Sequence, residues 1–402
     1  MADRTVTPTL LALTSFDKGY DFLRECRALG ARTFLLTVES LKGAPWPREA
    51  LDDVFFMPDL YNRVNVINAV SYLARNQPIT CIVPLDEFDV EMAATLREHL
   101  RIPGMNESTA RFFRDKLAMR IQARESGVLV PPFTRLWPYD SIRDFFARHS
   151  PPWVLKPRME ASAVGIRKLY DEESVWRALD TLHDLQSHYL LEQFIAGDVY
   201  HVDSIVVDGQ IAFAECHRYH KPPFEVYHGG GLFRTSTLAR VSSEEKELRD
   251  LTQQVATSLG MDRGILHTEF IRSSDDERFY FLETAARVGG AYIADMVEAA
   301  TGLNLWREWA RLEIATARNQ PYHLPAAKQD YGAVILSLAR QQWPDTSSYN
   351  DAEIAQRIDK EYHAGFVLRS AEHHRVTELL DNYGTRFMHD FAASMPAKES
   401  LR

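Results

Sequence analysis

Two glutamates, Glu269 and Glu283, lie in neighbouring segments that are rich in strand-forming residues. The polar residues 273–278 separate these segments, and the arrangement predicts a β-hairpin with a loop of several residues. Strand pairing symmetric about Asp276 would place the two glutamates directly opposite each other, where like charges are destabilising. Mg²⁺ would neutralise them, because it binds one or two carboxylates together with phosphate oxygens of a substrate.

The same hairpin carries other residues that fit an anionic ligand. Symmetric pairing also places Ile271 opposite Phe281. Alternation along the strand puts Arg287 on the side of the glutamates, and Gly289 and Gly290 then allow the backbone to approach a ligand closely. The pattern therefore predicts metal, anion and positive charge in one place. The alternative is a surface hairpin whose acidic side chains are merely solvated.

A second stretch whose residues could take part in chemistry surrounds Lys156. This lysine lies near the end of the predicted strand 153–157, and mostly small residues follow it up to Gly165. Small side chains let backbone N–H groups approach phosphate oxygens, and a nearby lysine adds positive charge. The Walker spacing GxxxxGK[ST] is absent, and a flexible hairpin loop explains the stretch equally well.

Two further segments have the composition of ligand contacts. The segment 192–195 lies where a linker between two sheets would run, and its main chain could face a purine base with Phe194 and Ile195 beneath it. An ordinary strand end is the alternative. The run 227–233 contains three consecutive glycines and is predicted to break regular structure, either as a mobile lid or as the tip of a long hairpin.

Length and composition bound the class of protein. The 402 residues predict two or three packed domains, and 45% hydrophobic with 25% charged residues is typical of a soluble globular chain. A formal net charge of −10 without a long basic run argues against nucleic acid as a main partner. The three cysteines are far apart and lack CxxC spacing, which fits a reducing cytoplasm. We see no signal peptide and no membrane-spanning run, so we expect a cytoplasmic protein without membrane contact.

The first hundred residues alternate between strand-like and helical patterns. The predicted elements are strands 9–14, 33–38 and 80–84 and helices 20–29, 64–73 and 88–100. This order predicts a small doubly wound parallel sheet. Asp86 and Glu87 follow a strand at the edge where open α/β sheets place ligands, although an acidic helix start is the commoner reason for such a pair.

In their order along the chain, these features resemble the ATP-grasp superfamily, and in particular the carboxylate–amine ligases that include bacterial L-amino acid ligases and biotin-carboxylase-like proteins. The resemblance runs from about residue 8 to residue 320. It implies a mixed α/β and α+β fold with a Rossmann-like parallel-sheet domain at the N-terminus. The implied parts are a Rossmann-like domain 1–104, a helical linker 105–130, a small lid subdomain 131–196 and a large nucleotide- and metal-binding domain 197–402 with a C-terminal extension.

The resemblance also assigns roles to single residues. Lys116 in Arg-Asp-Lys and Lys156 in Val-Leu-Lys-Pro match the two nucleotide lysines of the family. Glu269 in His-Thr-Glu-Phe and Glu283 in Phe-Leu-Glu match its two magnesium carboxylates, and Arg287 matches the arginine beside the acyl phosphate. The implied nucleotide contacts are Lys116, Lys156, Glu160, Ala161, Ser162, Ala163, Gly165, Glu192, Gln193, Phe194, Ile195 and Asp198. The implied substrate contacts are His228, Gly230, Gly231, His267, Arg287, Gly289 and Gly290.

Two positions depart from the family pattern. Ala285 stands where the family usually has an asparagine that helps to hold a metal. Val199 stands where an acid usually contacts the ribose hydroxyls, with Asp198 and Asp203 as the nearby acids. Neither departure removes the lysines or the arginine.

The implied activity is ATP-dependent ligation of a carboxylate to an amine, with Mg²⁺ or Mn²⁺ as cofactor and an acyl phosphate as intermediate. Arg287 and Lys156 are the implied catalytic residues, amino acids or a related small carboxylic acid the implied substrates, and a homodimer the implied assembly. A biotin-carboxylase-like enzyme and a nucleotide-binding regulatory protein are the alternatives. The lack of a Met-Lys-Met biotinylation segment argues against the first, whereas Ala285 and Val199 would count as decay under the second. Nothing in the sequence names the acid or the amine.

Overall fold

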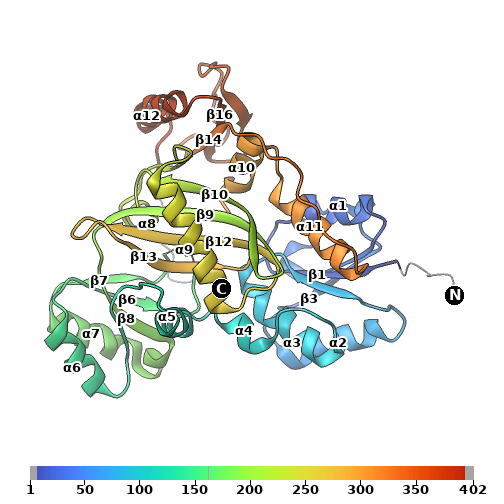
Figure 1. Cartoon of the computed structure of the whole chain (residues 1–402), viewed down its shortest axis with the longest axis horizontal. Coiled ribbons are helices and arrows are strands. Elements are labelled where there is room, and N and C mark those ends of the chain that lie inside the picture. The colour runs from blue at the N-terminus through green and yellow to red at the C-terminus, as the bar shows by residue number, and fades with distance from the viewer. Residues whose placement is uncertain (1–6, 162, 394–402) are drawn as a thin grey trace.

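Three β-sheets, each flanked by helices, organise the chain (Figure 1). This computed structural model describes residues 7–161 and 163–393. We call the sheets the N-terminal sheet, the small sheet and the large sheet. In Figure 1 the N-terminal sheet lies to the right in blue, the small sheet at lower left in green, and the large sheet in the centre.

The N-terminal sheet has four parallel strands in the order β3-β2-β1-β4. Its elements are β1 (Thr9–Thr14), α1 (Tyr20–Ala28), β2 (Arg32–Val38), β3 (Asp53–Met57), α2 (Arg63–Ala74), β4 (Cys81–Pro84) and α3 (Val90–Leu100), with short 3₁₀ helices at Glu39–Leu41, Arg48–Ala50 and Glu87–Asp89. Every residue of β1 is buried, because a central parallel strand has both faces covered. The predicted parallel sheet is confirmed, and the half-buried edge strand β3 is an addition to it.

The small sheet is antiparallel, with strand order β5-β8-β6-β7. Its strands are β5 (Phe133–Arg135), β6 (Trp153–Pro157), β7 (Arg167–Leu169) and β8 (Tyr189–Gln193), and the helices of this region are α4 (Glu107–Arg111), α5 (Lys116–Glu125), α6 (Tyr139–Arg148) and α7 (Glu172–Leu182), followed by a 3₁₀ helix at His183–His188. Apolar residues of α6 and α7 form one core with Trp153 and Leu155. This core fixes β6, which carries Lys156.

The large sheet has eight strands in the order β13-β12-β9-β10-β11-β14-β16-β15. Its elements are β9 (Gly197–Val207), β10 (Gln210–Tyr219), α8 (Pro223–Gly229), β11 (Phe233–Thr237), α9 (Ser243–Leu259), β12 (Gly264–Ser273), β13 (Phe279–Ala285), α10 (Ile293–Thr301), α11 (Leu305–Ala317), β14 (Tyr331–Leu338), β15 (Ile354–Arg357), β16 (His363–Ser370) and α12 (His373–Asp390). The C-terminal strands therefore extend the sheet that holds the two glutamates.

The β12–β13 hairpin confirms one predicted pairing and corrects the other. Glu269 is the direct cross-strand partner of Glu283, as symmetric pairing predicts. The pairing of Ile271 with Phe281 is wrong, because a register shift after Glu269 makes Phe270 the partner of Phe281. The shift is a β-bulge in which β13 carries one extra residue, Leu282.

The glycine-rich run is shorter than predicted. α8 continues through residue 229, so the prediction that regular structure is broken is wrong for residues 227–229. Pro223 begins this helix, where its fixed φ is favourable and its missing N–H costs nothing. The irregular part starts at Gly230 and Gly231, whose φ angles of 70° and 129° suit glycine.

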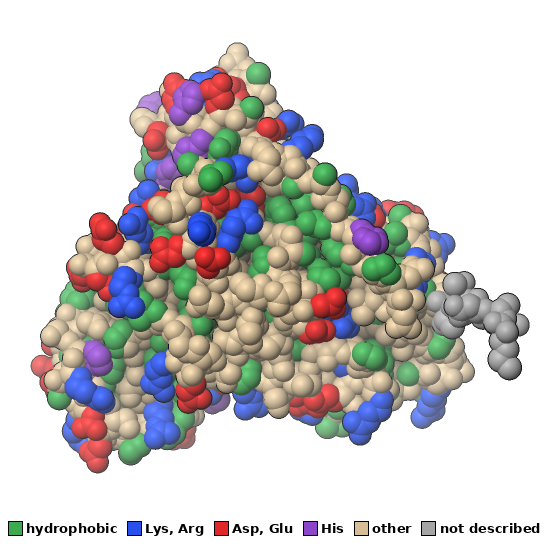
Figure 2. Space-filling model, in the orientation of Figure 1, with side chains coloured by type: hydrophobic (Ala, Val, Ile, Leu, Met, Phe, Trp, Pro, Cys, Tyr) green, Lys and Arg blue, Asp and Glu red, His purple; other side chains and the backbone are tan. Residues whose placement is uncertain are grey.

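The predicted domain boundaries after residues 104, 130 and 196 fall between strands of different sheets, and the division into four parts stays a prediction. Within the described part of the chain, no helix is long and apolar enough to cross a bilayer. On the face shown in Figure 2, acidic and basic side chains are interspersed, and its described residues form no extended basic patch.

Candidate active site

A cavity of about 410 Å³ lies where β6 of the small sheet faces β9, β12 and β13 of the large sheet. Charged groups line one part of it, and apolar residues of β9, β10, α8 and β11 line another. The structure brings these predicted site residues to the cavity: Lys116, Lys156, Glu160, Ala161, Ala163, His267, Glu269, Glu283, Arg287 and Gly290.

Each of the two facing glutamates contacts other side chains through one of its carboxylate oxygens. Glu269 Oε1 accepts a hydrogen bond from Tyr219 Oη at 2.9 Å and lies 3.6 Å from His267 Nε2. Glu283 Oε2 pairs with Lys116 Nζ at 3.0 Å. No described residue forms a hydrogen bond or ion pair with the remaining oxygens, Glu269 Oε2 and Glu283 Oε1. Two opposed carboxylates with one uncommitted oxygen each are a donor set that fits a hard divalent cation.

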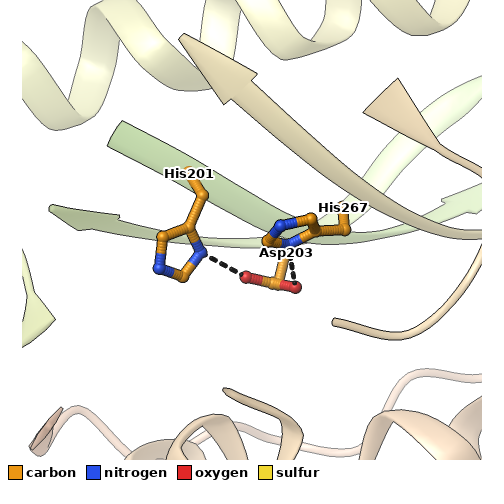
Figure 3. Close-up of side chains that lie close together, drawn as sticks. All are labelled: His201, Asp203 and His267. Atoms are coloured by element: carbon orange, nitrogen blue, oxygen red, sulfur yellow. Dashed lines mark hydrogen bonds and ion pairs between the residues drawn. The ribbon is translucent and has the colours of Figure 1, made fainter. Parts of the chain in front are cut away.

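A buried group formed by His201, Asp203 and His267 (Figure 3) contacts Glu269 through His267. Asp203 is fully buried, with Oδ1 3.0 Å from His267 Nδ1 and Oδ2 2.8 Å from His201 Nδ1. Burial by itself would raise the pKa of Asp203, but the two histidines hold it well below its usual range. Burial likewise disfavours the charged His267, yet the charge of Asp203 outweighs it and raises the pKa of His267 to about 9.

These same partners act on the carboxylate at the cavity. Burial would raise the pKa of Glu269, but the contacts with His267 and Tyr219 keep it lowered. Glu269 is therefore an anion that lies beside the positively charged His267. Sequence reasoning missed this arrangement, although His201-x-Asp203 and His267-x-Glu269 on adjacent strands were a signal for it.

The two predicted nucleotide lysines both line the cavity, and both already have partners. Lys116 Nζ donates to the carbonyl oxygen of Glu160 at 2.5 Å. Lys156 Nζ pairs with Glu192, which also accepts from Arg120 Nε at 2.6 Å. Burial lowers the pKa of Lys156 to about 8, with Glu192 opposing and Arg120 adding to that effect.

Several groups of the predicted adenine linker already have partners within the protein. Glu192 is 3% exposed and does not line the cavity. The backbone N–H groups of Gln193 and Phe194 donate to carbonyl oxygens of Pro132 at 2.8 Å and Pro152 at 3.0 Å. These two donors are therefore used within the protein, and the carbonyl groups are what the segment could offer a base.

The other predicted nucleotide contacts that the structure describes do not line the cavity. The Phe194 ring has Lys168 Nζ 3.4 Å from its centroid, and Ile195 packs against the apolar cluster that contains Val199. Asp198 pairs with Arg218 at 2.6 Å. Gly165, with a φ of 70°, belongs to the loop after β6 but does not line the cavity. Ser162 lies outside the described residues.

Asp203, one of the two acids considered for the ribose, is instead sealed between His201 and His267. A glycine is needed at position 289 for a different reason from the one predicted. A Cβ atom there would lie 2.6 Å from Asp203 Oδ1, so the glycine makes room for this carboxylate. Gly290 does line the cavity.

The predicted substrate contacts around α8 are only partly described. Gly230 and Gly231 follow α8 and do not line the cavity. The side chain of His228 lies outside the described residues. α8 contributes instead through Phe224 and Val226, which face the cavity.

Arg287 meets the N-terminal sheet through Glu87. Arg287 Nη2 lies 2.9 Å from Glu87 Oε1, and Arg114 Nη1 lies 3.1 Å from Glu87 Oε2. Burial would raise the pKa of Glu87, but the charges of Arg287 and Arg114 lower it to about 2. Asp86 caps the 3₁₀ helix by accepting from Phe88 N at 2.9 Å, so the helix-start explanation is confirmed for this residue. Glu87 is the member of the pair that reaches the site.

Comparisons with known proteins show which families and folds this chain resembles. Residues 149–295 match the ATP-grasp domain family. The L-arginine-specific L-amino acid ligase of Bacillus subtilis is 23% identical over 278 residues, which cover 67% of this chain and 66% of that protein, slightly under two thirds of its length.

Two solved structures have the same fold over nearly the whole chain. The L-amino acid ligase from Bacillus licheniformis superposes with a TM-score of 0.74 at 16% identity, covering 96% of this chain and 98% of that one. The N5-carboxyaminoimidazole synthetase from Staphylococcus aureus, complexed with ADP, gives 0.71 at 14% identity and covers 95% and 98%. The chain therefore has the ATP-grasp fold that the order of its motifs implied.

Proposed function

We propose that this protein is an ATP-dependent carboxylate–amine ligase that forms an amide or peptide bond through an acyl phosphate. One observation carries the proposal: Glu269 and Glu283, each with one carboxylate oxygen outside the contacts among the described residues, line the same cavity as Lys116, Lys156 and Arg287. Phosphoryl transfer depends on positioning and charge neutralisation, and this set of residues supplies both. The similarity to amino acid ligases favours the same class of reaction.

Glu269 and Glu283 are the residues that would hold Mg²⁺ or Mn²⁺. When bound, the divalent ion supplies Lewis-acid charge to the β- and γ-phosphates of ATP. Ala285, at the usual asparagine position, is buried and offers no ligand atom, so the protein itself would hold the ion through the two glutamates. Lys116 and Lys156 contact the phosphates, which requires Lys156 to turn partly from Glu192.

The first chemical step joins the acid substrate to phosphate. A carboxylate oxygen attacks the γ-phosphorus, the bond to the β,γ-bridging oxygen breaks, and ADP leaves. Arg287 stabilises the bound carboxylate, and Glu87 holds the guanidinium in place from the N-terminal sheet. Arg287 thus acts at the acyl end of the cavity.

The second step forms the C–N bond. The amine nitrogen attacks the acyl carbon, the bond to the phosphate oxygen breaks, phosphate leaves, and the nitrogen loses a proton. Arg287 is placed to stabilise the oxyanion of the tetrahedral intermediate. The loop after β6 and α8 border the cavity and would exclude water, because hydrolysis of the acyl phosphate would waste ATP.

The test separates ligation from nucleotide binding. Arg287→Ala should abolish amide formation, measured by mass spectrometry, while ADP affinity, measured by calorimetry, changes by less than about threefold. Arg272→Ala is the control, because Arg272 lies on the same hairpin, pairs with Glu244 at 2.5 Å and does not line the cavity. Unchanged product formation by Arg287→Ala would contradict this role.

A further inference from the structure

A buried series of polar contacts crosses strands of the large sheet and ends at Glu269; Figure 3 shows its middle part, His201, Asp203 and His267. It starts at Thr235 of β11, whose Oγ1 lies 2.7 Å from His201 Nε2. His201 and Asp203 on β9 continue it to His267 on β12. Thr235, His201 and Asp203 are fully buried, and only the end at His267 and Glu269 reaches the cavity.

Strand register explains why these groups meet. In the antiparallel β9–β12 pair, His201 is the cross-strand partner of Glu269, and Asp203 is the partner of His267. Residues two apart on a strand point to the same face, so both acid–imidazole pairs share one side of the sheet. Each carboxylate therefore lies opposite one imidazole and beside the other.

The hydrogen bonds fix the direction of the His267 ring. Because Asp203 is an anion, its two oxygens accept from Nδ1–H of His267 and Nδ1–H of His201. The ring of His267 then presents Nε2 to Glu269 Oε1 at 3.6 Å. Tyr219 holds the same oxygen at 2.9 Å. Because His267 and Tyr219 both contact Oε1 of Glu269, Oε2 is the oxygen that is left to bind a cation.

We propose that Asp203 and His201 are positioning residues that act through His267 to hold Glu269 in its metal-binding orientation. The inference rests on the proposed function in one respect, that Glu269 binds the divalent cation. Partners behind a ligand orient it, and their loss costs about 10- to 100-fold in metal affinity. Asp203 is buried away from the cavity, so it acts through His267 and not on substrate.

The neighbouring His217 provides a matched control. Its ring stacks on that of His201 with centroids 4.7 Å apart, and both side chains are fully buried. Among the described residues, neither ring nitrogen of His217 has a hydrogen-bond partner. His217 Nε2 does lie 4.0 Å from Asp203 Oδ2, but this is beyond hydrogen-bond range. His201→Phe and His217→Phe therefore make the same change at adjacent buried sites, and only the first removes a hydrogen bond of the series.

The experiment measures Mn²⁺ binding to the full chain in the presence of ADP, with free Mn²⁺ read by electron paramagnetic resonance. We expect His201→Phe and Asp203→Asn to weaken Mn²⁺ binding by about tenfold or more. His217→Phe should stay within about twofold of wild type, and metal-free ADP binding should be retained in all three. Thermal unfolding checks that each variant folds. Asp203→Asn keeps the shape of the side chain, so it tests the same series if His201→Phe does not fold.

Two results would overturn the positioning role. One is Mn²⁺ affinity in His201→Phe and Asp203→Asn equal to that of His217→Phe. The other is a stoichiometric transition metal in the purified wild-type protein that is lost in His201→Phe, since the cluster would then be a metal site itself. Wild-type protein that binds no Mn²⁺ with ADP would instead contradict the cation site of the proposed function.

Discussion

Glu87 follows the N-terminal sheet and connects it, through its carboxylate, to Arg287 at the cavity. It lies between Arg114 and Arg287, and their charges lower its pKa to about 2 against a usual 4.5. A carboxyl whose pKa is lowered in the folded state stabilises the protein above pH 4.5. That stability is lost as the pH falls through 2.

Glu87→Gln tests this directly. At pH 7 the variant should unfold with a free energy about 3 kcal/mol lower than wild type. The difference should shrink as the pH falls from 4.5 toward 2, because Glu87 takes up a proton in the unfolded wild-type chain over this range and in the folded protein only near pH 2. Urea unfolding of both proteins at several pH values is the measurement. A difference that stays constant over this range would contradict the account.

Glu192 is a structural residue in this fold as well as a member of the predicted linker. Its carboxylate is shared by Arg120 and Lys156, and Arg120 is fully buried. Removing the shared anion leaves two buried cations without their partner, which costs about 3–5 kcal/mol. We expect Glu192→Gln to lose this much in free energy of unfolding.

The control for Glu192 is an exposed ion pair. Glu173 pairs with Arg177 at 3.6 Å on the surface of α7, and Glu173→Gln should leave the urea midpoint almost unchanged. Equal midpoints for the two variants would mean that the Glu192 carboxylate does not stabilise the fold. The lowered pKa of Glu192, despite its burial, reflects the same two cations.

At the scale of elements, the β12–β13 hairpin and the turn after it shape the site. The bulge at Leu282 changes the register on one side of Glu269 while keeping the two glutamates opposed. The turn then brings Gly289 against Asp203. The backbone of this turn therefore packs directly on the buried polar group.

Adjacent glycines allow a sharp test of that packing. In Gly289→Ala the new Cβ would lie 2.6 Å from Asp203 Oδ1 and 3.2 Å from His267 Nδ1, whereas nothing lies within 4 Å of a Cβ at Gly290. We expect Gly289→Ala to lower the free energy of unfolding by about 1–3 kcal/mol. Gly290→Ala should be neutral or slightly stabilising. Thermal melts that rank the two variants in the opposite order would contradict this packing.

Local patterns in the sequence predicted most of the elements and the glutamate pair. Alternation and helical periodicity depend on neighbours along the chain, so β1, α1, β9 and the β12–β13 hairpin could be read from them. The bulge could not, because a single extra residue leaves no mark on composition. The half-buried strand β3 escaped for a similar reason, since its Asp53-Val54-Phe55-Phe56-Met57 lacks a clear period.

Contacts between distant elements limited the prediction of the site. Asp203 looked like a candidate for the ribose because it follows the linker, and only the β9–β12 register shows that it faces His267. Glu87 meets Arg287 across 200 residues of sequence, and no local pattern reports such a contact. The motifs therefore identified the charged groups at the cavity but not the buried partners that hold them.

At the scale of the whole molecule, the site exists only where the three sheets meet. The small sheet supplies Lys156, the large sheet supplies the glutamates, and the N-terminal sheet supplies Glu87 beside Arg287. Such an arrangement suits a reaction that needs nucleotide, acid and amine in one enclosed place. The homodimer, the cytoplasmic location and the lack of a nucleic-acid partner stay predictions.

The most direct test of ligase activity measures phosphate release from Mg·ATP with single amino acids and with pairs, with mass spectrometry on each mixture. We expect that release requires a suitable pair and that a product with the mass of the condensed pair accumulates in equal amount. Release without any condensed product, release that requires bicarbonate and biotin, or no release despite bound ATP would contradict this expectation.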